Sequence, residues 1–370
     1  MLSSFTPKNL VLFDCRVASH YVATGNAMIK IILDAMGGDN APQATVNGAV
    51  LALEKNKDLY LILTGIKDKI EGELKKYKYD KSRLEIVDCP DVIGMNDIPT
   101  EAVKRKESSL IKAFWMLKKQ DDICGLVTAG STGATIVGGQ LILGRIRGIK
   151  RPALCPAIPN SRGKMTLLID CGANAECKSI MLCQFALLGS AYATATFGVK
   201  NPKVGLLNNG TEEHKGDPLR QETFKMMSQM KDINFVGNVE GRDITIGECD
   251  VVVSDGFSGN VALKSIEGCG KLVLGIMKKE LSSSLSSKIG YLFIRKAIKR
   301  MKNQLDFDKV GGALLLGVKK PVIKSHGTSK PVTIANSIEN AVNAYKGNLI
   351  GSVEKLLENA DLDSFAGDNE

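Results

Sequence analysis

The chain is poor in aromatic residues and in histidine. Aromatic residues make up 5% of its 370 positions, with one tryptophan, and there are three histidines. This is too little aromatic surface for the stacking platforms that bind single-stranded nucleic acid. None of the nine cysteines forms a C-x2-C pair, so the ligand spacing of a zinc cage is missing. We therefore expect no metal centre and no nucleic-acid partner.

Common cofactor and nucleophile signatures are missing as well. The sequence has no G-x-G-x-x-G after its first apolar run, no G-x-x-x-x-G-K-[ST] and no G-x-S-x-G. Dinucleotides, P-loop nucleotides and serine-hydrolase chemistry are therefore disfavoured, and we expect no cofactor. No run of 18 apolar residues is present, which argues against a membrane-spanning helix. The odd number of cysteines fits reduced thiols in the cytosol.

Composition divides the chain into three parts. Residues 1–27 have one Arg, one Lys and no long apolar stretch, so we expect a leader outside the fold, disordered or non-native, and not a secretory signal. Residues 28–346 alternate apolar runs with helix-like patterns, which predicts a single catalytic domain. Residues 347–370 form an acidic C-terminal segment whose end we expect to be frayed.

One pattern recurs six times: an apolar, often β-branched run followed by a turn of small residues with polar side chains. The copies lie at 31–42, 126–134, 167–178, 204–216, 251–260 and 322–329. Helix-like patterns follow most of them, which is typical of βα units in a mainly parallel sheet with helices on both faces. Such sheets bind ligands at the carboxyl ends of their strands. The sequence therefore predicts a three-layer α/β/α fold with six polar turns gathered at one edge.

Individual elements follow from the same periodicity. We expect strands over 29–33, 59–64, 84–87, 166–169, 204–207 and 250–254, with another from 125. We expect helices over 42–55, 66–77, 107–119, 178–197 and 218–230.

Much of the net charge of +9 comes from residues 288–304, which hold six Lys/Arg and no acidic residue. At helical spacing the apolar residues of this segment fall on one face and the basic residues on the other. A helix of this kind is typical of segments that lie on anionic lipid. With the apolar residues upstream it predicts a protruding amphipathic helical hairpin over 277–305, with a break at Gly290. An ordinary core-packed helix with a basic outer face, and a docking patch for an acidic protein, are the alternatives.

The hairpin residues expected to contact anionic lipid or an acidic protein partner share either the apolar or the basic face. They are Phe293, Ile294, Arg295, Lys296, Ile298, Lys299, Arg300 and Met301.

Two of the turns carry groups suited to an anion. Ser131, Thr132 and Gly133 lie where a helix begins, and the free backbone N–H groups there can hold phosphate. Plain N-capping by Ser131 explains the same residues. Asn174 and Lys178 lie at a second turn-to-helix junction, where a cation would stabilise an oxyanion or a phosphate; a solvated surface lysine is the alternative.

The remaining turns supply amides, carboxylates and one histidine. Asn208 and Lys215 lie in one very polar loop, and loops this polar after a buried strand are more often functional than structural. His326 follows the last apolar run and can transfer a proton near neutral pH, although a structural role is the alternative. The other candidates in these turns are Asp34, Asp39, Glu240, Arg242, Asp255 and Asn260.

Taken together, these strings resemble the PlsX family of bacterial phosphate acyltransferases. The matching strings, in family order, are ILDAMGGDNAP, TAGSTGA, RPAL, IDCGANAECK, GLLNNGTEEHKG, FVGNVEGRDI, DVVVSDGFSGNVALK, GGALLLG and VIKSHGTS. The resemblance extends from Met28 to about Tyr345. Asn40, Cys171 and Asn209 depart from residues that are common in the family.

The resemblance implies a homodimer whose fold is similar to that of the phosphotransacetylases and isopropylmalate-type dehydrogenases. It also implies transfer of a long-chain acyl group from acyl-acyl carrier protein to inorganic phosphate, the entry step of phospholipid synthesis. Because the acyl phosphate must reach a membrane acyltransferase, it further implies a cytoplasmic enzyme that associates peripherally with an anionic membrane surface.

For this reaction we expect direct attack of bound phosphate on the thioester, helped by positioning and preorganised donors, without a covalent acyl-enzyme. The expected phosphate- and substrate-binding residues are Asp39, Ser131, Thr132, Gly133, Glu240 and Arg242. The expected catalytic residues are Asp34, Asn174, Lys178, Asn208, Lys215, Asp255, Asn260 and His326. A soluble phosphotransacetylase that uses acyl-coenzyme A and a non-catalytic membrane-surface organiser of lipid enzymes are the alternatives.

Overall fold

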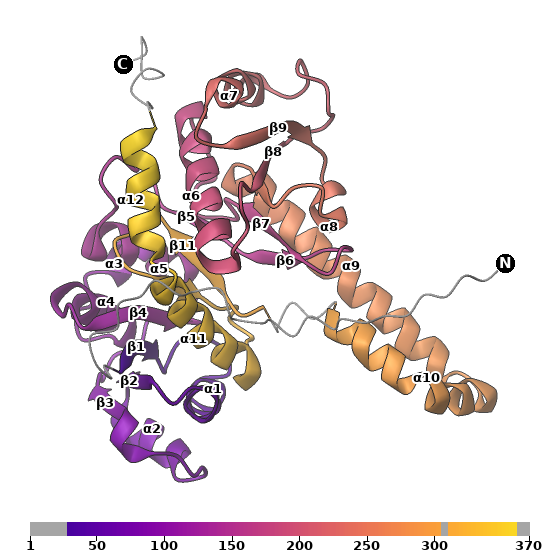
Figure 1. Cartoon of the computed structure of the whole chain (residues 1–370). Coiled ribbons are helices and arrows are strands. Elements are labelled where there is room, and N and C mark those ends of the chain that lie inside the picture. Colours follow the sequence, from indigo (N-terminus) through magenta and orange to yellow (C-terminus); the bar gives the residue numbers. More distant parts are fainter. Residues whose placement is uncertain (1–27, 305–309, 361–370) are drawn as a thin grey trace.

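The computed structural model describes residues 28–304 and 310–360, and its strands divide between two sheets (Figure 1). The first sheet has seven strands in the order β3-β2-β1-β4-β12-β11-β5, and the second has five in the order β6-β7-β10-β8-β9. Strand pairs are parallel except at β11 and β6, which run antiparallel to their neighbours. The strands are β1 (Ile29–Asp34), β2 (Leu59–Gly65), β3 (Leu84–Asp88), β4 (Ile123–Thr128), β5 (Ala153–Cys155), β6 (Ala157–Pro159), β7 (Met165–Ile169), β8 (Lys203–Leu207), β9 (Asn234–Val239), β10 (Val251–Val253), β11 (Ala313–Leu316) and β12 (Val322–Lys324).

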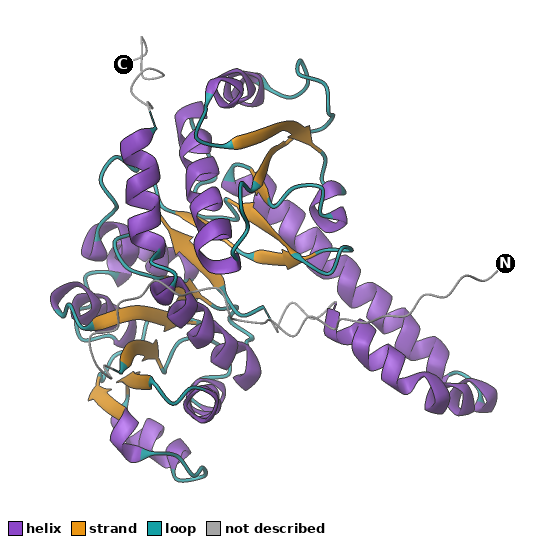
Figure 2. Cartoon of the chain, viewed as in Figure 1, coloured by secondary structure: helices purple, strands orange, loops and turns teal. Residues whose placement is uncertain are grey.

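Helices cover both faces of the sheets (Figure 2). They are α1 (Gln43–Lys55), α2 (Lys67–Leu74), α3 (Pro99–Ala102), α4 (Ser109–Lys119), α5 (Thr132–Gly138), α6 (Ser179–Phe197), α7 (Pro218–Gln229), α8 (Asp243–Ile246), α9 (Gly256–Ser282), α10 (Leu285–Gln304), α11 (Pro331–Lys346) and α12 (Leu349–Asn359). Every strand and helix range expected from the periodicity is present, and their ends differ from the expectation by at most three residues. The α/β fold class with mainly parallel strands is thus confirmed.

Alternating side chains of β1 show how the first sheet is buried on both faces. Ile31 and Leu33 pack into the core formed with α1 and α11, whereas Ile32 packs with Phe114 of α4 on the opposite face. All three β1 side chains are fully buried. A strand buried on both faces has an almost continuous apolar sequence, which is what this run shows.

The two sheets meet at Pro156, which is all that separates β5 of the first sheet from β6 of the second. Around this bend the Leu168 N–H donates to the Pro156 carbonyl at 3.2 Å and the Cys171 N–H donates to the Leu154 carbonyl at 3.0 Å. The second sheet is covered by α6 and α7 on one side, and by α8 and the first turns of α9 on the other. Division into two sheets was not predicted, because β5 and β6 are too short to show a period.

One helix of the described residues, α6, is long and apolar enough to cross a membrane by length and composition. Its most apolar window is 67% buried, and α6 packs against α7, α12 and the second sheet. We therefore interpret α6 as a core helix.

A long helical hairpin projects from the body (Figure 1). It consists of α9 and α10, which are joined at Ser283–Ser284. At 27 residues, α9 is about 40 Å long. The expected break at Gly290 is wrong, because α10 continues through this residue; an isolated glycine weakens a helix but does not end it. Of the expected contact residues, Phe293 is 84% exposed, the basic residues are exposed, and Ile298 and Met301 are half-buried.

The expected leader at 1–27, the last hairpin residue at 305 and the expected frayed end at 361–370 lie outside the described residues.

Candidate active site

All six polar turns lie at the carboxyl ends of strands, as the sequence predicts. They follow β1, β4 and β12 in the first sheet and β7, β10 and β8 in the second, and in each sheet the three strands are direct neighbours. The six turns divide three and three between the carboxyl ends of the two sheets. Lys264 and Glu267 of α9, which packs on the second sheet, lie close enough to His326 of the first sheet to influence its pKa.

Asp34 ties the turn after β1 to the end of β4 and to the start of α4. Its side chain is 2% exposed and accepts hydrogen bonds from Ser109 Oγ at 2.7 Å and Thr128 Oγ1 at 2.8 Å. Burial raises the pKa of Asp34, and the two hydroxyl donors partly offset that rise. A Cβ on Gly37 would lie 2.6 Å from Asp34 Oδ2, so only glycine lets the backbone of this turn lie against the Asp34 carboxylate. Asp34 is therefore a positioning group, with its oxygens engaged by protein donors.

The turn after β1 also contacts the turn after β12. The Asp39 N–H donates to the Gly327 carbonyl at 2.8 Å, and Asn40 Nδ2 donates to the Thr328 carbonyl at 3.1 Å. The Asp39 side chain is exposed beside Gly327. Asp39 and His326 therefore lie in two turns that touch.

Ser131, Thr132 and Gly133 open α5. Ser131 is buried, and its Oγ caps the helix by accepting the Ala134 N–H at 3.4 Å. A Cβ on Gly133 would lie 2.4 Å from Pro99, so this glycine is needed for packing against α3. The capping role of Ser131 is thus present, and Thr132 is half-buried at the first turn.

Lys324 was missed by the sequence reasoning. It ends β12, is 8% exposed, and donates through Nζ to the Ser325 carbonyl at 2.5 Å. Burial, with a smaller contribution from Lys264 of α9, lowers the pKa of Lys324 to about 8, although the charges of Asp34 and Asp39 act in the opposite sense. A cation this deeply buried beside carboxylates at a strand end is a mark of a functional site.

His326 lies two residues further on, with an exposed side chain. Its Nδ1 accepts the Thr328 N–H at 3.2 Å, so the neutral ring carries its proton on Nε2. Partial burial lowers the pKa of His326, and Lys264 lowers it further, while Glu267 acts in the opposite sense. His326 is thus a neutral imidazole near pH 7, and it faces α9 of the second sheet.

In the second sheet, Asp170 organises the turn after β7. It is fully buried, which raises its pKa, and it accepts hydrogen bonds from the backbone of Leu154 and Ala173 and from Asn174. Asn174 Nδ2 donates to the Pro152 carbonyl at 2.8 Å and to Asp170 at 2.9 Å. Both amide hydrogens of Asn174 are therefore engaged in holding the turn. Lys178 is exposed at the start of α6.

The first turn of α9 packs directly against the Asp170 turn. The Gly256 N–H donates to the Asn174 carbonyl at 2.7 Å, and a Cβ on Gly259 would lie 1.9 Å from the Asp170 carbonyl oxygen. The adjacent Asn260 is exposed and lies beside Gly172. Asn260 thus places an exposed side-chain amide, which has no hydrogen-bond partner among the described residues, beside the Asp170 turn.

Asp255 caps α9 and is paired with Arg220, a second residue that the sequence reasoning missed. Asp255 Oδ1 accepts the Ser258 N–H at 2.8 Å, and Oδ2 forms an ion pair with Arg220. Both side chains are nearly buried. Burial raises the pKa of Asp255, but the hydrogen bonds from Ser258 and the Arg220 charge outweigh it, so the pKa lies below its usual value.

The loop after β8 is held by two asparagines. Asn208 Nδ2 donates to the Lys215 carbonyl at 3.1 Å, and Asn238 Nδ2 donates to the Glu212 carbonyl at 2.8 Å. Lys215 is half-buried, and among the described residues its Nζ forms no ion pair. The loop therefore presents a cation at the edge of the second sheet.

Glu240 and Arg242 follow β9, at the same edge. They form an ion pair with each other, and Arg242 is 73% exposed. Glu240 and Arg242 therefore neutralise each other, and they lie outside the six polar turns.

Comparisons with known proteins agree with this arrangement. The family described as "fatty acid synthesis protein" matches residues 29–351. A phosphate acyltransferase from Clostridium tetani is 42% identical over 331 residues, which cover 90% of this chain and 98% of the relative. One from Clostridium botulinum is 44% identical over 333 residues, covering 89% and 99%.

Two solved structures with a similar fold are a phosphotransacetylase and a phosphotransacylase. A phosphotransacetylase from Streptococcus pyogenes superposes with a TM-score of 0.54 at 17% identity, over 90% of this chain and 94% of that one. A branched-chain phosphotransacylase from Enterococcus faecalis gives 0.54 at 15% identity, over 86% and 99%. These likenesses confirm the expected similarity of fold to phosphotransacetylases.

Proposed function

The chain belongs to the fatty acid synthesis protein family, the PlsX phosphate acyltransferases, and on this premise we propose that it transfers a fatty acyl group from acyl-acyl carrier protein to inorganic phosphate. The observation that carries the proposal is that strand ends of both sheets present cations that form no ion pair among the described residues, together with an exposed amide. Lys215 and Asn260 belong to the second sheet, and Lys324 and His326 to the first. Such an arrangement suits an anionic nucleophile and a developing oxyanion.

The reaction needs little acid or base help. A phosphate oxygen attacks the thioester carbonyl carbon, the tetrahedral oxyanion collapses, and the C–S bond breaks to give an acyl phosphate and a thiolate. Phosphate is already partly dianionic near neutral pH, and a thiol with a pKa of about 8.5 is a good leaving group. Positioning and preorganised donors therefore supply the catalysis, with no covalent acyl-enzyme.

Phosphate binds, in this proposal, at Thr132, Gly133 and the backbone N–H groups of the α5 turn, with Lys215 or Lys178 as the counter-charge. Ser131 supports that turn as its cap. The buried charge of Lys324 raises the positive potential of the same edge.

The thioester oxygen requires a hydrogen-bond donor. Asn174 is occupied by Pro152 and Asp170, and Asn208 is partly occupied by Lys215. Of these three asparagines Asn260 is the exposed one, so it is the preferred donor. Asp34 and Asp255 position the turns. Neutral His326 accepts the proton that the attacking phosphate gives up and passes it to the leaving thiolate.

The hairpin suits a membrane and a second copy of the chain. Exposed apolar side chains line it, among them Leu272, Ile276, Leu292 and Phe293. We assign the basic α10 face to anionic lipid or to the acidic carrier protein, and the apolar α9 residues to a homodimer contact. A cytoplasmic enzyme with peripheral membrane association follows from this assignment.

Vesicle binding tests this part of the proposal. The test variant reverses four charges: Arg295→Glu, Lys296→Glu, Lys299→Glu and Arg300→Glu. The control reverses four exposed lysines of the body: Lys75→Glu, Lys78→Glu, Lys225→Glu and Lys231→Glu. At about 1 kcal/mol per basic residue near an anionic surface, the hairpin variant should bind anionic vesicles at least about a hundredfold more weakly, and the control should bind nearly as wild type does.

Equal sedimentation of both variants would contradict the membrane assignment and favour a soluble phosphotransacetylase. That alternative also predicts equal or better turnover with acyl-coenzyme A than with acyl-acyl carrier protein, measured as phosphate-dependent kcat/KM. A non-catalytic organiser of lipid enzymes predicts binding to vesicles with no turnover of either thioester.

A further inference from the structure

Positive charge without a counter-charge gathers on the loop 145–151, which leads into β5. Residues 123–169 contain no acidic residue, and four of the seven residues in this loop are basic. The four are exposed and form no ion pair among the described residues: Arg145, Arg147, Lys150 and Arg151. The exposed Lys319 lies beside the loop, since its N–H donates to the Gly144 carbonyl at 3.1 Å. The loop and Lys319 therefore form one basic surface.

The conformation of this loop is fixed by the fold. Ile146 and Ile149 are buried in the core shared with α6, which anchors the loop at two points between its basic residues. Arg145 Nη1 donates to the Ile149 carbonyl at 3.1 Å, so this arginine holds the loop from within. A surface that is already ordered loses little conformational entropy when a partner binds.

The loop lies beside the candidate active site. At its end the Pro152 carbonyl accepts a hydrogen bond from Asn174 Nδ2 at 2.8 Å, and Asn174 belongs to the polar turn after β7. Nearer its middle, the Lys150 N–H donates to Gln184 Oε1 and Gln184 Nε2 donates to the Gly148 carbonyl, both at 2.8 Å. Gln184 lies about 8 Å along α6 from the start of that helix. The basic loop is therefore attached to both the turn and the helix that follow β7.

We propose that the loop 145–151, together with Lys319, is the docking surface for the acidic carrier protein that presents the acyl thioester. The inference rests on the proposed function. A carrier protein delivers its thioester on a flexible arm, so its body must dock next to the site and not over it. An acidic surface complements basic side chains that have no counter-charge of their own. Leu141 is 64% exposed and follows Gln140, which accepts Arg151 Nη1 at 3.4 Å, so an apolar contact is available beside the charges.

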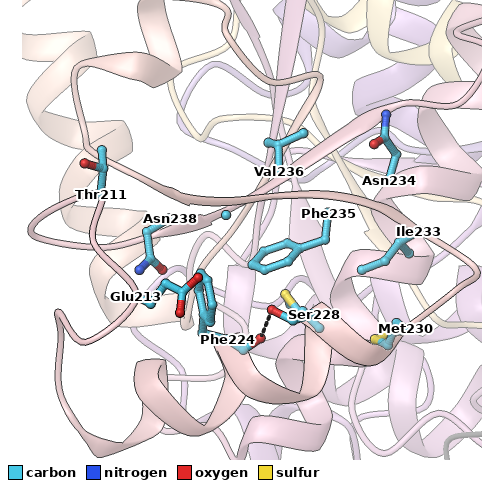
Figure 3. A pocket seen from close by; sticks show the side chains of 12 residues that line it. Thr211, Glu213, Phe224, Ser228, Met230, Ile233, Asn234, Phe235, Val236 and Asn238 are labelled. Atoms are coloured by element: carbon cyan, nitrogen blue, oxygen red, sulfur yellow. Dashed lines mark hydrogen bonds between the residues drawn. The ribbon is translucent and has the colours of Figure 1, made fainter.

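Two other surfaces suit this partner less well. Figure 3 shows the groove between β9 and α7, whose lining includes the acidic Glu213 and no lysine or arginine, so it offers an acidic protein no complementary charge. The basic face of α10 lies beside the exposed Leu292 and Phe293, and this combination is typical of a lipid surface. The carrier protein and the lipid then occupy different parts of the molecule.

Equilibrium binding of acyl carrier protein that carries an unreactive S-alkyl thioether, measured by fluorescence anisotropy, tests the surface without relying on turnover. The loop variant reverses three charges: Arg147→Glu, Lys150→Glu and Arg151→Glu. Arg145 is kept because it holds the loop. The body control reverses three exposed lysines: Lys75→Glu, Lys78→Glu and Lys231→Glu. The hairpin variant reverses three charges of α10: Arg295→Glu, Lys299→Glu and Arg300→Glu.

At low salt the loop variant should bind the carrier protein at least about tenfold more weakly than wild type, and this difference should shrink at high salt. The body control and the hairpin variant should bind it as wild type does. The neutral variant Arg147→Gln, Lys150→Gln and Arg151→Gln should show a smaller loss in the same direction, which separates an effect of charge from misfolding. The loop variant should still sediment with anionic vesicles as wild type does.

Wild-type affinity of the loop variant for the carrier protein would overturn the docking assignment, even if phosphate-dependent turnover is normal. Loss of carrier binding in the hairpin variant alone would overturn it as well, and so would a loop variant that loses vesicle binding and keeps carrier binding. Carrier binding that depends on the loop, in a protein with no phosphate-dependent turnover, would support the docking surface and contradict the proposed reaction.

Discussion

Replacing Lys324 by methionine should stabilise the folded protein while lowering its phosphate-dependent turnover. Lys324 is 8% exposed, and the one hydrogen bond of its ammonium group among the described residues goes to the Ser325 carbonyl. Burial and Lys264 lower the pKa of Lys324 from 10.5 to about 8. At 1.36 kcal/mol per pKa unit, the charged form costs the folded state about 3 kcal/mol near pH 7.

The sign of the pH dependence follows from proton binding. Between pH 8 and 10.5 the unfolded chain still binds the Lys324 proton and the folded chain has released it, so this residue makes stability rise with pH across that window. Lys324→Met removes the ionisable group. The gain in unfolding free energy of Lys324→Met over wild type should therefore be greatest near pH 7 and should shrink by about 3 kcal/mol by pH 10.5. The lost hydrogen bond to the Ser325 carbonyl reduces this gain by the same amount at every pH.

Urea unfolding at pH 7, 9 and 10.5 measures this difference, with Lys225→Met as the control for loss of an exposed lysine. Phosphate-dependent turnover of the Lys324→Met variant should fall at least about tenfold despite the gain in stability, since a buried charge at the site is lost. A stability difference from wild type that stays constant between pH 7 and 10.5 would refute the reasoning.

Three further substitutions test the site. Lys215→Ala should lower phosphate-dependent turnover at least about tenfold by removing one charge-assisted contact, and unchanged rates would exclude this lysine from the phosphate site. Arg220→Met should lower the unfolding free energy by about 3 kcal/mol because Asp255 is left buried and unpaired; the double variant with Asp255→Asn should regain part of this loss in urea unfolding, and no recovery would argue against the pair. Gly259→Ala should cost about 2 kcal/mol or more in thermal unfolding, because its Cβ would meet a backbone carbonyl at 1.9 Å, whereas Gly268→Ala in open space should be neutral or stabilising.

The six polar turns could be predicted from sequence because each combines a buried apolar run with small residues. Glycine at 37 and 259 is required by close approaches that leave no room for a Cβ, so the turn sequences record the geometry directly. The division into two sheets could not be predicted in the same way. It depends on the bend at Pro156 between two three-residue strands, and neither is long enough to show a period.

The site residues that were missed gain their roles from the tertiary structure. Arg220 lies in an ordinary helical sequence and becomes part of the site only because α7 brings it to Asp255. Lys324 ends an apolar run, where sequence alone suggests a solvated side chain, and its burial comes from neighbouring strands and α9. Conversely, Asn174 has the composition of an oxyanion donor, yet the fold uses both its amide hydrogens to hold a turn.

The most direct test of the central claim is the release of carrier-protein thiol from palmitoyl-acyl carrier protein with and without inorganic phosphate, with hydroxylamine present to trap acyl phosphate. Thiol release that requires phosphate, with a matching yield of palmitoyl hydroxamate that depends on both phosphate and enzyme, is the result expected of an acyl-acyl carrier protein:phosphate acyltransferase. Release at the same rate without phosphate, or no release at all, would contradict it.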